Sequence, residues 1–167
     1  MQQVAQATGP APFGRMYLAY FGTYLACIIA LVAIVLLFDI DLPSSLGVVV
    51  PGIAALIPGY MFVRRMHRRM TRGERAKFAL GAAIIALAII SLLLLAGMAA
   101  ADLEMSLQGF ATFIGLEGEM PVGILAAFIV ITMAVSFIMI YFFVNMMGRS
   151  AMTVLEKQAS DTPDKIA

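Results

Sequence analysis

The sequence is poor in the residues that build cross-links, metal sites and water-soluble surfaces. It has one cysteine, Cys27, which excludes a disulfide within the chain, and one histidine, His67, without cysteine or carboxylate partners at metal-ligand spacing. Charged residues make up only 13% of the chain, against about a quarter in soluble domains. A water-soluble fold of this size could not cover so much apolar surface, so we expect an integral membrane protein without a metal or other cofactor.

Long apolar runs take the place of those residues. Hydrophobic residues make up 62% of the 167 residues, and a helix needs about 20 mostly apolar residues to cross a bilayer. Four stretches qualify, at about 16–38, 44–63, 76–101 and 121–144, and their centres hold no Lys, Arg, Asp, Glu or His. We therefore predict an all-α, four-helix transmembrane bundle, a single domain over residues 1–157 followed by a polar tail at 158–167.

The charges are sorted along the chain. All eleven Lys and Arg residues lie before the first span, between the second and third, or after the fourth. The other two loops hold no cation but six carboxylates, at Asp39, Asp41, Asp102, Glu104, Glu117 and Glu119. Because basic loops stay in the cytoplasm, we expect both termini and the middle loop to be cytoplasmic.

The second span carries a repeated Pro-Gly pair. Pro51-Gly52 and Pro58-Gly59 are seven residues apart, which places both prolines on nearly the same helix face. Proline removes a backbone donor and crowds the carbonyl four residues earlier, so we expect a bent or locally distorted helix inside the bundle. A static kink and a moving part of a transporter are both consistent with the pattern.

The loop between the second and third spans is rich in arginine. Its cations are Arg64, Arg65, Arg68, Arg69 and Arg72. They could determine topology alone, grip anionic lipid headgroups at the cytoplasmic face, or contact an acidic partner protein. Thr71 and Glu74 fit a helix capping box, and so short a connection predicts that the second and third spans are antiparallel neighbours. Nucleic-acid binding is not expected, because no aromatic interleaving or folded domain accompanies the cations.

The segment between the third and fourth spans has a helical pattern of its own. Leu103, Leu107, Phe110 and Ile114 recur at helical spacing, which predicts a short amphipathic helix on the membrane surface.

The sequence resembles a family of small, uncharacterised four-span bacterial inner-membrane proteins. The resemblance covers about residues 16–100 and rests on three features: the exit of the first span at Phe38-Asp39-Ile40-Asp41-Leu42-Pro43, the small-residue second span, and the cationic loop leading into Thr71-Arg72-Gly73-Glu74. It implies a multi-pass protein of the bacterial inner membrane, and it implies no site residues.

Three functional hypotheses follow. No ionisable group lies at bilayer depth and no catalytic motif is present, so we do not expect an enzyme. The first hypothesis is an accessory or structural subunit, or scaffold, that packs against other membrane proteins or copies of itself through small-residue faces. The alternatives are a small oligomeric transporter or channel using the second span, and an anionic-lipid-binding protein.

Overall fold

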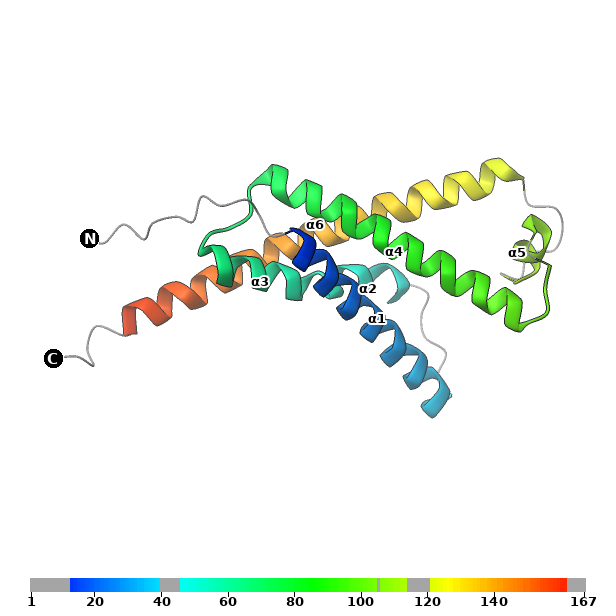
Figure 1. The fold of residues 1–167 in the computed structure, drawn as a ribbon, viewed down its shortest axis with the longest axis horizontal. Helices are drawn as coiled ribbons and strands as arrows, with labels where there is room; N and C mark the ends of the chain where they lie inside the picture. Colours follow the sequence, from blue (N-terminus) through cyan, green and yellow to red (C-terminus); the bar gives the residue numbers. More distant parts are fainter. Residues whose placement is uncertain (1–12, 40–45, 105, 114–120, 162–167) are drawn as a thin grey trace.

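The computed structural model describes residues 13–39, 46–104, 106–113 and 121–161, and within them the regular structure is helical. These described residues form six helices (Figure 1): α1 (Phe13–Phe38), α2 (Leu46–Ala54), α3 (Leu56–Met66), α4 (Arg72–Ala100), α5 (Leu107–Phe113) and α6 (Val122–Asp161). The expected tail at 158–167 is helical as far as Asp161, and its remaining residues lie outside the described part.

Three of these helices are long and apolar enough to cross a membrane. They are α1, α4 and α6, and they correspond to the first, third and fourth predicted spans. Large apolar side chains on them stay exposed, among them Leu36, Leu92 and Val130. Lipid can solvate such surface at no cost, whereas water cannot. The described residues thus form an all-helical structure with three helices that have the length and apolar composition of membrane spans.

The second predicted span is divided into α2 and α3 at Ala55. Pro58 has no N–H to give to the Ala54 carbonyl, and its ring crowds that same carbonyl. The Ala55 N–H instead bonds the Gly52 carbonyl, three residues back, at 3.0 Å. The helix therefore breaks at Ala55, three residues before the second proline, and neither half alone is long enough to span a membrane.

Three helices end on a residue in the left-handed region. Asp39 after α1, His67 after α3 and Asp102 after α4 have φ of 49°, 49° and 53°. Asp and His tolerate this conformation better than most non-glycine residues, and the His67 N–H bonds the Val63 carbonyl at 2.8 Å. These residues turn the chain at the ends of the helices.

The buried core occupies the half of the bundle next to the arginine-rich loop, which we call the elbow (residues 64–72). Core side chains come from the first half of α1, from α2, α3 and the elbow, from the first two thirds of α4 and from the middle of α6, namely Met16, Tyr20, Tyr24, Val50, Ala54, Ala55, Phe62, Met66, Met70, Phe78, Ala79, Ala82, Ala83, Ala86, Ile89, Ile140 and Val144. Beyond this elbow half, α4 and α6 cross and diverge, with α5 between their far ends (Figure 1).

The prediction that the second and third spans are packed neighbours is wrong. Helices α2 and α3 pack on α6 and α1, and α4 also packs on α6 and α1. The elbow reverses the chain direction, but the buried stripe of α6 (Ser136, Ile140, Val144 and Gly148) recurs every four residues and gives both partners a surface. Helices α2, α3 and α4 therefore all pack against α6.

The short helix predicted between the third and fourth spans is present as α5. Ser106 begins it by accepting the Gly109 N–H on its hydroxyl at 3.0 Å, as helix N-caps do. Phe110 lines the cleft between α4 and α6, and Ala111 is fully buried. Ile114 lies outside the described residues.

Candidate functional site

The elbow is held in shape by one carboxylate. Glu74 accepts two hydrogen bonds from the Arg68 guanidinium, at 2.8 and 2.7 Å. The predicted capping box is also present, because the Thr71 hydroxyl accepts the Glu74 N–H at 3.2 Å and the Thr71 N–H donates to Glu74 at 2.8 Å. Glu74 thus fixes both the start of α4 and the position of Arg68.

These bonds favour the charged form of Glu74. The Arg68 guanidinium, and after it the Thr71 backbone, lower the pKa of the Glu74 carboxyl to about 2 against the opposing effect of burial. The Arg68 guanidinium also lies 5.1 Å from the centroid of the buried Phe62 ring, within the range of a cation–π contact. Arg68 is therefore a structural residue of the elbow.

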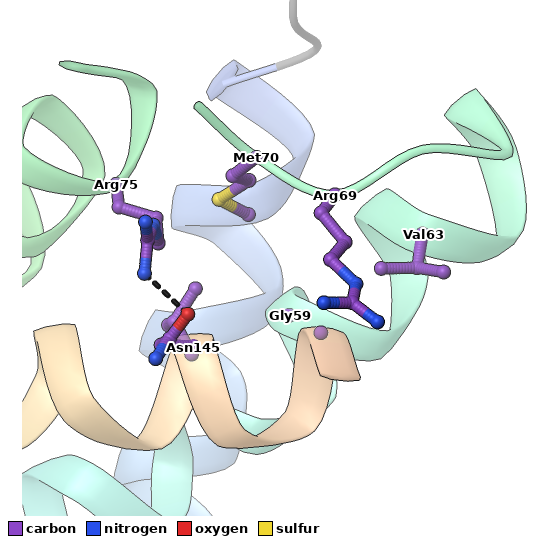
Figure 2. A pocket seen from close by; sticks show the side chains of 8 residues that line it. Gly59, Val63, Arg69, Met70, Arg75 and Asn145 are labelled. Atoms are coloured by element: carbon purple, nitrogen blue, oxygen red, sulfur yellow. Dashed lines mark hydrogen bonds between the residues drawn. The ribbon is translucent and has the colours of Figure 1, made fainter. Parts of the chain in front are cut away.

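The other four predicted arginines are exposed, but only one of them lines a pocket. Arg64, Arg65, Arg69 and Arg72 are all exposed. Arg69 alone among them lines a small pocket between the elbow, α3 and α6, together with Gly59, Val63, Met70, Arg75, Val144, Asn145 and Gly148 (Figure 2). The structure thus separates the five predicted arginines into one paired residue, one pocket residue and three surface residues.

Arg75 is a site residue that the sequence reasoning missed. It lies in the first turn of α4 and donates a hydrogen bond to the Asn145 side-chain oxygen on α6 (Figure 2). Its guanidinium also lies 5.0 Å from the centroid of the Tyr141 ring. Asn145 follows directly after the fourth apolar run. A polar amide at that position is the feature of the sequence that could have indicated a polar contact there. The two residues are seventy positions apart, so only the folded chain pairs them.

The Pro-Gly residues of the second span form a packing surface. Pro51, Gly52, Pro58 and Gly59 are all buried. A Cβ on Gly52 would lie 2.7 Å from the Phe143 ring, and one on Gly59 would lie 3.5 Å from Met147. The glycines therefore let α2 and α3 approach α6 closely.

Two larger apolar clefts lie in the half of the bundle away from the elbow. One, of about 220 Å³, lies between α4, α5 and α6, and its polar lining residues are Ser91 and Thr132. The other, of about 350 Å³, lies between α1, α2 and α4 and includes Tyr24 and Leu93. Within the described ranges, no three His, Cys, Asp or Glu residues stand close enough to hold a metal ion.

No family model, curated protein or solved structure matches the chain.

Proposed function

We propose that this protein is a non-enzymatic membrane subunit that crosses the bacterial inner membrane four times and packs against other membrane proteins or a second copy of itself. The observation that carries the proposal is the position of the core. Buried side chains concentrate in the elbow half, while α4 and α6 diverge beyond it and leave two apolar clefts. Helices that touch over half their length can bury more surface only against another transmembrane segment or lipid.

The polarity of the bundle supports the orientation in this proposal. The start of α1, the elbow and the later part of α6 lie at one end and carry Arg15, the elbow arginines and Arg149. Asp39, Asp102 and Glu104 follow the opposite ends of α1 and α4. A cationic end of this kind stays in the cytoplasm, which agrees with two cytoplasmic termini and an even number of crossings.

The second span supports packing more than transport. A pathway through a broken helix needs polar groups or free carbonyls facing a water-filled space. Here Phe143 covers Gly52, and Val144 and Met147 cover Gly59. The transporter hypothesis lacks such a space at the break, within the residues the structure describes.

The proposal is tested by photo-crosslinking in the native membrane. A photoreactive amino acid replaces Phe128 or Leu93, which line the two clefts, and matched controls carry it at Leu18 or Leu80, which are exposed in the elbow half. We expect crosslinks to a protein, or to a second copy, from the cleft positions and much weaker ones from the controls. The mass of the full-length protein in nanodiscs then separates a homo-oligomer from a hetero-complex.

Crosslinks to lipid alone, together with a strictly monomeric mass in nanodiscs, would overturn the proposal.

A further inference from the structure

Arg75 is an incompletely satisfied cation at the edge of the bundle. A guanidinium has five N–H donors, and one nitrogen bonds Asn145 while the face of the group lies over Tyr141. The Nε atom of Arg75 is buried and bonds no acceptor among the described residues. A buried donor without an acceptor is costly, so an acceptor brought by a ligand would be favoured here.

The charge of Arg75 is also unbalanced. The neighbouring carboxylate, Glu74, is paired with Arg68, and no carboxylate among the described residues forms an ion pair with Arg75. Arg69 lines the same pocket, and its side chain extends from the elbow toward α6 as that of Arg75 does (Figure 2). Two cations on one pocket repel each other unless an anion lies between them, and this juxtaposition indicates a negatively charged ligand.

The pocket limits how that ligand enters. Gly59 and Gly148 line it and contribute no side chain, and its cavity measures about 10 Å³, which is room for one water-sized group. Asn145 uses its oxygen for Arg75, so its amide N–H₂ remains a donor. A tetrahedral anion would place one oxygen in the cavity and leave the rest outside.

We propose that Arg69, Arg75 and the Asn145 amide bind a phosphate group. Arginine forks bind phosphate oxygens with parallel hydrogen bonds, and Val63, Met70 and Val144 make the remaining wall apolar. A phosphate at this position is carried either by an anionic lipid headgroup at the membrane edge or by a soluble phosphate. The site is independent of the subunit role proposed above, because it lies at the elbow and not in the clefts.

The test measures phosphate binding to the full-length protein in detergent by native mass spectrometry. The probes are dioleoyl phosphatidylglycerol, the matching diacylglycerol without phosphate, and inorganic phosphate. We expect Arg69→Gln and Arg75→Gln to weaken phosphatidylglycerol binding about tenfold, because each removes a fork from one bound group. Arg64→Gln and Arg65→Gln remove the same charge from exposed positions outside the pocket, and we expect changes below about threefold.

The controls distinguish a lipid phosphate from a soluble phosphate and test whether the phosphate binds at the pocket. Retention of phosphatidylglycerol over diacylglycerol supports a lipid headgroup, and saturable binding of inorganic phosphate that depends on Arg69 supports a soluble source. If Arg75→Gln does not fold, as judged by circular dichroism, Arg69→Gln decides the matter because its side chain is exposed. Equal weakening by all four substitutions, or equal binding of diacylglycerol, would overturn the proposal.

Discussion

Glu74 shows how much one side chain can organise at the residue scale. It joins the elbow to α4 through a two-bond contact with Arg68 and a reciprocal cap with Thr71. These contacts can be separated by substitution, because glutamine can still accept the Thr71 N–H but cannot carry the charge.

We predict that Glu74→Gln lowers the free energy of unfolding by about 0.5 kcal/mol, since a partly solvated ion pair contributes little. Glu74→Ala removes the cap as well and should cost about 1 kcal/mol more. Unfolding by sodium dodecyl sulfate in mixed micelles measures both, with Glu156→Gln as the control that removes the same negative charge at an exposed site. Equal losses for the Gln and Ala variants would mean that the cap contributes nothing.

The same carboxylate predicts a pH dependence. Its pKa in the folded protein is lowered to about 2, below the roughly 4.3 of an unfolded glutamate. The stabilisation is therefore fully present above the unfolded value and is lost as the pH falls through about 2. The stability difference between wild type and Glu74→Gln, from the same unfolding assay, should shrink steadily between pH 5 and pH 2; a constant difference would contradict the assigned pKa.

Gly52 is a residue at which a single added methyl group should destabilise the packing between α2 and α6. A Cβ there would lie 2.7 Å from the Phe143 ring, so Gly52→Ala should destabilise the bundle by about 1 kcal/mol through overpacking. Gly22→Ala is the matched control, because its Cβ would have no neighbour within 4 Å and alanine favours helix. Phe143→Leu should restore part of the loss in a double-mutant cycle, and additive effects would exclude the contact.

At the scale of the element, the broken second span follows from the position of one proline. The break at Ala55 lies next to Ala54. The Ala54 carbonyl has no hydrogen-bond donor four residues later, because Pro58 lacks a backbone N–H. Pro51 has the same chemistry but lies inside α2, where the helix continues. The two prolines are alike in sequence and differ in structural effect.

We therefore expect Pro58→Ala to join α2 and α3 more than Pro51→Ala does. Spin labels at the exposed positions Ile53 and Arg64 would report the change by dipolar electron paramagnetic resonance. The Pro58→Ala distance should approach the roughly 16 Å between backbone positions of a continuous helix, with Pro51→Ala unchanged. Equal shifts in the two variants would assign the break to their combined effect.

At the scale of the whole molecule, the number of crossings depends on whether α2 and α3 act together. Each is short, but residues 46–66 placed end to end would reach about 30 Å, which is the thickness of the hydrocarbon core. The pair also runs along α6 (Figure 1), and this arrangement favours a crossing in two pieces.

Cysteine labelling tests this arrangement. In a Cys27→Ser background, single cysteines replace Asp39, His67, Glu104 or Glu156, all exposed. An impermeant maleimide applied to spheroplasts should label the cysteines at 39 and 104 and leave those at 67 and 156 unlabelled until lysis. Labelling at 67 equal to that at 39 would mean that the second span does not cross.

The sequence alone was enough for the properties that depend on local composition. Apolar runs of membrane length predicted α1, α4 and α6, and the pairing of Thr71 with Glu74 predicted the cap of α4, because hydropathy and capping act within one segment. The sorting of cations to one side predicted an orientation, which remains a prediction.

Tertiary structure alone decided what these segments pack against. The short loop between the second and third predicted spans predicts that they are neighbours, yet both pack on α6, whose buried stripe is the complementary surface. The pocket joins Arg69 and Arg75 near the elbow to Asn145 at the far end of the chain. Loop length and periodicity limit which helix faces can be buried, but side-chain shape selects the partner face, and no sequence spacing encodes that choice.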